Sequence, residues 1–143
     1  MPRDPFGLQR FVDAQDEAST YDRALAELLA GRKRSHWMWF VFPQIAGLGQ
    51  STMSRRYAIS SLAEARAYLD HPVLGPRLLE CARALLGQRG KTAAEILGEI
   101  DATKLRSSMT LFARAAADEP LFREVLDRYC DGAPDEATER CLS

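Results

Sequence analysis

The sequence contains few of the residues from which metal and disulfide sites are built. Its 143 residues include three cysteines, at positions 81, 130 and 141, and two histidines, His36 and His71. The number of cysteines is odd, and their spacing matches no zinc-binding pattern. We therefore expect reduced thiols, no metal site and no cofactor.

Long apolar runs are also absent. No stretch approaches the roughly 20 apolar residues that cross a membrane, and the opening MPRDPFGLQRF lacks the apolar segment of a signal peptide. The sequence has no internal repeat and no low-complexity tract. We expect a cytoplasmic protein with no membrane contact, folded as one domain over residues 1–143.

The chain has almost no net charge, but its charges are segregated. The overall charge is −1. Residues 31–114 carry 13 basic and 6 acidic groups, whereas the flanking segments are both acidic. A basic middle either attracts an anion or pairs with the acidic ends. The short basic run at 32–34 offers too few charges for nucleic acid, so we expect no nucleic-acid partner.

Signals for helix starts follow one another along the chain. Ser61 with Glu64 and Thr92 with Glu95 have the spacing of capping boxes, and Asp101 is a further candidate N-cap. Apolar residues recur at spacings of three and four, and no segment alternates convincingly as a half-exposed strand does. We predict an all-α fold, a compact single-domain bundle of about seven to nine short helices.

One stretch, SHWMWFVFPQIAGLGQS at residues 35–51, concentrates the aromatic side chains. It holds both tryptophans, Trp37 and Trp39. A strand at residues 36–42 would have no partner in the chain, so we expect one or two helical turns that end at Pro43. The aromatic side chains either fill the core or form the wall of a pocket.

Polar residues border this aromatic run. Arg34 and His36 lie at its start, and Gln44 follows Pro43. A buried polar group needs a partner, and a ligand can be that partner. The alternative is that His36 is a core residue whose ring nitrogens are satisfied within the protein.

A glycine-rich turn follows, with Gly47 and Gly49 just before Ser51. Glycines allow the backbone to approach a ligand closely, and a helix start favours an anion. The third glycine of a dinucleotide fingerprint is missing and no strand precedes the turn. A plain loop is therefore the competing interpretation.

A polar notch interrupts an otherwise apolar helix near residue 105. Lys104, Ser107 and Ser108 share one helical face because they are three and four residues apart. Hydroxyls are unfavourable inside helices. They either bond back to carbonyls one turn earlier or serve a ligand or a neighbouring helix.

Three strings in the sequence resemble one protein family. They are GRKRSHWMWFVFPQIAGLGQS, YAISSLAEARAYLDHPVLGPRLLEC and KLRSSMTLFARA. Together they are similar to an uncharacterised bacterial family of small single-domain proteins, sometimes labelled calpastatin. The resemblance runs from about Phe6 to Leu142 and implies a compact, all-helical domain. It implies no activity, substrate or cofactor.

Two functional hypotheses remain. In the first, a pocket binds a small anionic molecule, such as a nucleotide or a sugar phosphate. If that site is catalytic, His36 is the acid–base group and Lys104 stabilises negative charge. The candidate ligand-binding residues are Arg34, Trp37, Trp39, Gln44, Gly47, Gly49, Ser51, Ser107 and Ser108. In the second, the aromatic residues form the core of a non-enzymatic protein-interaction module. The sequence leaves open whether the protein is an enzyme.

Overall fold

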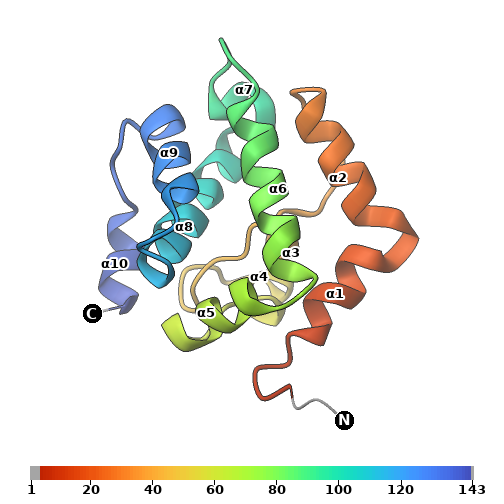
Figure 1. The fold of residues 1–143 in the computed structure, drawn as a ribbon, viewed down its shortest axis with the longest axis vertical. Coiled ribbons are helices and arrows are strands. Elements are labelled where there is room, and N and C mark those ends of the chain that lie inside the picture. Colours follow the sequence, from red (N-terminus) through yellow and green to blue (C-terminus); the bar gives the residue numbers. More distant parts are fainter. Residues whose placement is uncertain (1–3, 143) are drawn as a thin grey trace.

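The protein is described here by a computed structural model that covers residues 4–142. Within that range the chain is helical and contains no strand, and one parallel β-bridge joins Ile45 to Ile59. The prediction of an all-α, single-domain bundle is therefore confirmed (Figure 1). The α-helices are α1 (Gln9–Asp16), α2 (Thr20–Leu29), α3 (Met38–Val41), α4 (Thr52–Arg56), α5 (Leu62–Asp70), α6 (Leu74–Leu86), α7 (Ala93–Leu97), α8 (Glu99–Ala115), α9 (Pro120–Tyr129) and α10 (Glu136–Leu142).

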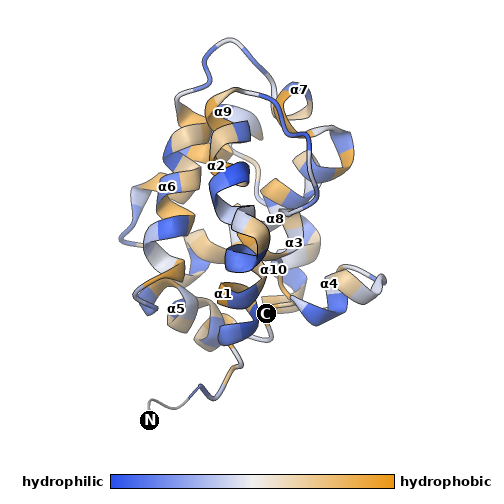
Figure 2. Cartoon of the chain, turned by 90° about the vertical axis from the view of Figure 1, so that its right-hand side faces the viewer, coloured by the Kyte–Doolittle hydropathy of each residue, from blue (hydrophilic) through white to orange (hydrophobic). Residues whose placement is uncertain are grey.

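Helices α6 and α8 organise the core. Helix α6 packs against α2, α5 and α9, with α2 and α9 on opposite sides of it, and α8 contacts α5, α7, α9 and α10 (Figure 1). The ring of Phe112 on α8 lies 5.4 Å from that of Tyr68 and 5.8 Å from that of Phe122, measured between centroids. All three are fully buried. Helices such as α6 carry apolar and polar residues on different faces, as Figure 2 shows.

The helix starts follow local capping chemistry. At α7 the Thr92 hydroxyl accepts from the Glu95 N–H, and the Glu95 carboxylate accepts from the Thr92 N–H, which confirms the predicted capping box. At α5, Ser61 caps the helix through the N–H of Glu64. The Glu64 carboxylate, however, accepts from Ser60 rather than from Ser61, so the second box is only half formed.

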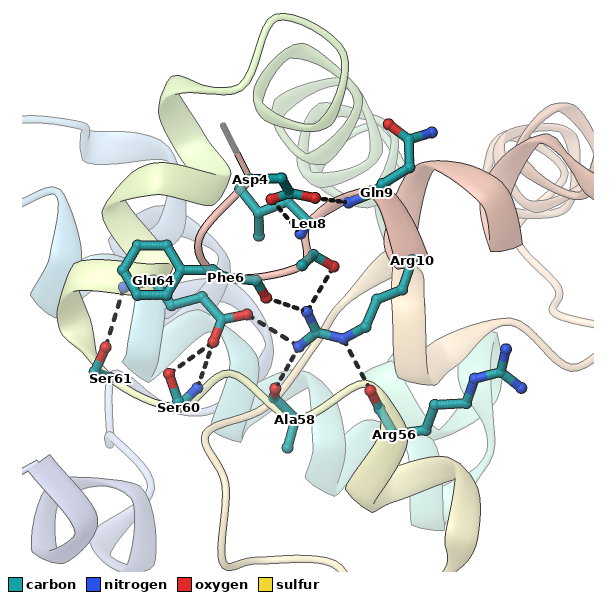
Figure 3. A network of polar contacts seen from close by, with 11 residues as sticks. Asp4, Phe6, Leu8, Gln9, Arg10, Arg56, Ala58, Ser60, Ser61 and Glu64 are labelled. Carbon is teal, nitrogen blue, oxygen red and sulfur yellow. Dashed lines mark hydrogen bonds and ion pairs between the residues drawn. The ribbon is translucent and has the colours of Figure 1, made fainter. Parts of the chain in front are cut away.

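The side chain of Arg10 fastens α1 to the segment between α4 and α5. All five guanidinium N–H groups have acceptors, a number that only arginine can supply. The acceptors are the carbonyls of Phe6, Gly7, Arg56 and Ala58 and the buried carboxylate of Glu64 (Figure 3). This network holds in place the segment that carries Ile59 and the β-bridge.

The aromatic stretch forms the single turn of α3 and the chain on either side of it. The expected helical turn within residues 36–42 is present, and the helix ends at Val41, two residues before Pro43. The carbonyl of Phe40 accepts from the buried amide of Gln15 at 2.7 Å, which satisfies a helix-end carbonyl inside the core. No helix in the described range has the length and apolar character needed to span a bilayer.

Candidate functional site

A carboxylate on α2 fixes the loop that leads into α3. Glu27 accepts from the N–H of Arg34 at 2.8 Å and from the N–H and hydroxyl of Ser35 at 3.0 and 2.6 Å. It also accepts from the indole Nε1 of Trp37 at 2.9 Å. Partial burial alone would raise the pKa of Glu27, but these hydrogen bonds stabilise the anion and lower the pKa to about 2. The loop is therefore tied to a permanent negative charge.

Between this loop and the start of α8 lies a cavity of about 540 Å³. Three basic side chains line it: Lys33 and His36 from the loop, and Lys104 from α8. Trp39 and Ile100 contribute apolar surface, and the Ile100 side chain is 76% exposed. This volume is within the range of roughly 300–1,000 Å³ found for small-molecule sites.

The two lysines of the cavity share one carboxylate. Asp101 Oδ2 lies 2.9 Å from Lys33 Nζ, and Asp101 Oδ1 lies 3.6 Å from Lys104 Nζ. Each ammonium also stands over an indole ring. Lys33 Nζ is 5.2 Å from the Trp37 centroid, and Lys104 Nζ is 5.1 Å from that of Trp39.

The N-terminus of α8 adjoins the cavity, since Gly98, Glu99 and Ile100 are among its lining residues. The N-cap of α8 is Gly98, with φ of 90°, and it provides no side-chain acceptor for the first N–H groups of the helix. A glycine suits this position because the positive φ is strained for other residues. Asp101 lies in the first turn of α8 and is not its N-cap, which corrects the sequence-based expectation.

A separate hollow of about 220 Å³ lies at the glycine-rich turn. Gln44, Gly47 and Gly49 line it together with Arg55. Ser51 does not line it; its hydroxyl accepts from the Ser54 N–H at 3.1 Å and caps α4. Gln44, Gly47 and Gly49 thus line a different hollow from the one that Lys104 lines.

Of the three residues of the polar notch, only Ser107 contacts the segment that begins the C-terminal helix. Ser107 donates toward the Thr103 carbonyl at 3.3 Å and the Asp135 carboxylate at 3.2 Å. Thr110 accepts from the Asp135 N–H at 2.9 Å. Ser108 is fully buried, and its hydroxyl has no hydrogen-bond partner within residues 4–142. Neither serine lines the large cavity.

The structure therefore brings together only part of the predicted site. His36, Trp39 and Lys104 line one cavity. Trp37 has no exposed surface and belongs to the core, and the exposed Arg34 contacts Glu27 through its backbone.

Sequence reasoning missed two residues of this region, Glu27 and Asp101, and it considered Lys33 only as part of the basic run at 32–34. Lys33 lies in the basic run before the tryptophans, and Asp101 is three residues before Lys104, a spacing at which opposite charges meet on a helix. Those two signals were present in the sequence. For Glu27 the sequence contains no such signal, because the path of the loop before α3 determines which hydrogen-bond donors reach its carboxylate.

The structure is that of a small all-helical domain, and its described part holds a cavity lined by basic and aromatic side chains. The chain matches the family model described as "Protein of unknown function (DUF1810)" over residues 5–142, and it belongs to that family. The predicted resemblance to an uncharacterised family is thereby confirmed.

A solved structure agrees with this assignment. The chain is 52% identical to the conserved hypothetical protein Rv1873 from Mycobacterium tuberculosis, whose crystal structure it matches with a TM-score of 0.94. The match covers 97% of this chain and 98% of that one. No curated protein matches the sequence.

Proposed function

We propose that this protein binds a small anionic molecule, phosphate- or nucleotide-like, in the cavity between the 33–39 segment and the start of α8. The observation that carries the proposal is the convergence of Lys33, His36 and Lys104 beside Trp39. Ammonium groups suit phosphate oxygens as compact positive charges. The first N–H groups of α8 add donors of the same polarity.

The apolar side of the cavity favours a ligand with a flat ring as well as a charge. Trp39 is only partly buried, and it lines the cavity together with the exposed Ile100. An indole presents a large rigid surface to a planar group at small entropic cost. A nucleotide combines such a ring with phosphate, and this matches the division of the cavity into apolar and basic parts.

A second part of the proposal concerns catalysis. If a bound phosphate ester is a substrate, His36 is the acid–base group and Lys104 stabilises developing negative charge. We further propose a reducing compartment such as the cytoplasm, which the free thiols of Cys81, Cys130 and Cys141 support.

A thermal-shift screen against nucleotides, sugar phosphates and inorganic phosphate tests the binding. A ligand present at one hundred times its Kd stabilises the folded state by about 2.7 kcal/mol. Lys104→Met should abolish the shift, because it removes a charge from the cavity. Arg55→Met is the matched control, since Arg55 is an exposed cation beside the separate hollow.

The two variants also show which of the two hollows binds the ligand. A shift lost in Arg55→Met and kept in Lys104→Met would move the site to the glycine-rich turn. No shift with any compound would overturn the proposal and favour the non-enzymatic interaction module.

A further inference from the structure

We propose that the carboxylate of Asp101 is a built-in competitor of the ligand: in the free protein it occupies the place that the anionic group of the ligand takes on binding. This inference rests on the proposed function and concerns how the same site is regulated. Asp101 is the only carboxylate within residues 4–142 that forms an ion pair with Lys33 or Lys104, and it contacts both.

The need for an anion at this point follows from burial. The Lys33 side chain is only 9% exposed, and that of Asp101 is 17% exposed. An ammonium so poorly hydrated needs a counter-charge nearby. Two lysines share a single carboxylate, so these three groups carry a net charge of +1. Glu99 also lines the cavity but forms no ion pair with either lysine. An incoming oxyanion would be attracted by this excess positive charge but repelled by Asp101.

Each lysine also has contacts that do not involve Asp101. Lys33 donates its backbone N–H to the Ile96 carbonyl at 2.7 Å, and its ammonium stands over the Trp37 ring. Lys104 is part of α8, and its ammonium stands over the Trp39 ring. Removing the Asp101 charge should therefore leave both cations in place. Asp101 then acts as a competitor rather than as a support.

The chemistry of the displacing group follows from this arrangement. It must carry at least one full negative charge and offer two oxygens, because it replaces a carboxylate that reaches two ammonium groups with separate oxygen atoms. Phosphate monoesters and inorganic phosphate meet both conditions. Neutral ring compounds do not, and they should gain nothing from the loss of Asp101.

The test uses inorganic phosphate as the probe, titrated by isothermal calorimetry at low ionic strength. Asp101→Asn keeps the side-chain shape and one acceptor oxygen for Lys33, and we expect its Kd to be roughly tenfold lower than that of the wild type. Glu99→Gln is the matched control. It removes a negative charge from the same turn of α8 and from the same cavity wall, but Glu99 forms no ion pair within the described residues. Its Kd should stay within about threefold of the wild type.

Each outcome decides between the two proposals. Wild-type binding with equal or weaker binding by Asp101→Asn would overturn the competitor role and leave the proposed function intact. Absence of binding in both proteins would overturn the proposed function itself. Thermal unfolding followed by circular dichroism verifies that each variant is folded, and Asp101→Ser replaces Asp101→Asn if the asparagine is not tolerated.

Discussion

The indole Nε1 of Trp37 donates to Oε1 of Glu27 across 2.9 Å, which joins the aromatic stretch to α2. The same carboxylate accepts from the backbone N–H groups of Arg34 and Ser35. The loop between these anchors carries Lys33 and His36 to the cavity. One partly buried hydrogen-bond cluster around Glu27 therefore positions the loop that carries the candidate site.

Loss of this anchor should weaken the whole fold. Glu27→Ala leaves the Trp37 indole and two backbone N–H groups without their acceptor, and we expect the free energy of unfolding to fall by about 2–3 kcal/mol. Urea denaturation measures this change. Asp22→Ala, an exposed position on the same helix, should change stability by no more than about 0.5 kcal/mol. Equal effects at both positions would show that Glu27 has no special role.

The same residue should give stability a specific dependence on pH. The pKa of Glu27 is about 2 in the folded protein and 4.5 for the free side chain. Because the folded value is the lower one, the stabilisation is fully present above about pH 4.5 and is lost as the pH falls from 4.5 towards 2.

Glu27→Gln removes this component and so isolates it from other acidic groups. The difference in unfolding free energy between wild type and Glu27→Gln should shrink as the pH falls through that window. A difference that stays constant between pH 5 and pH 3 would contradict the assignment.

The helical architecture was predictable because its signals are local. Apolar spacing, the Thr92 cap and the Glu119–Pro120 start all act within a few residues, and each is present in the structure. The site was less predictable, because its residues meet through a loop. Trp37 and Trp39 are two positions apart, yet one lies in the core and the other on the cavity wall.

The hydroxyls of α8 show a second limit of sequence reasoning. Their pattern correctly indicates a polar notch, but the pattern alone does not say what fills it. Ser107 and Thr110 form hydrogen bonds with Asp135, just before α10. Asp135 follows them in the sequence by 28 and 25 residues, respectively. The acidic C-terminal segment thus packs on the basic middle through specific contacts, including the ion pair of Arg114 with Glu139.

Arg10 should not be replaceable by lysine. A lysine ammonium has three donors at one point and cannot reach acceptors spread along both edges of a guanidinium. We expect Arg10→Lys to lower the free energy of unfolding by about 2–3 kcal/mol. Arg23→Lys, at an exposed position with one hydrogen bond to Thr20, should stay within about 0.5 kcal/mol of the wild type. A similarly small effect for Arg10→Lys would show that its charge alone matters.

Asp135 should control the docking of α10. Its Oδ2 atom accepts from Ser107 and from both the N–H and the hydroxyl of Thr138. Asp135→Ala should cost about 1–3 kcal/mol and accelerate amide exchange across residues 136–142 more than elsewhere. Glu136→Ala, one residue along, should leave that exchange nearly unchanged. Uniform acceleration over the whole chain would contradict a local role.

The two tryptophans should differ in their access to solvent quenchers, and this difference tests the cavity without a ligand. Trp39 lines the cavity and is partly exposed, whereas Trp37 is fully enclosed. Acrylamide should therefore quench a large part of the wild-type emission.

In Trp39→Phe the remaining emission comes from Trp37, and it should lie at shorter wavelength and resist acrylamide. Iodide should quench Trp39 more strongly at low salt than at high salt, because Lys33 and Lys104 attract anions to its ring. The variant Lys104→Met should weaken that salt dependence while acrylamide quenching persists. Strong quenching of the Trp37 emission in Trp39→Phe would contradict the enclosed position of Trp37. Iodide quenching that does not change with salt concentration would contradict a positive field at the cavity.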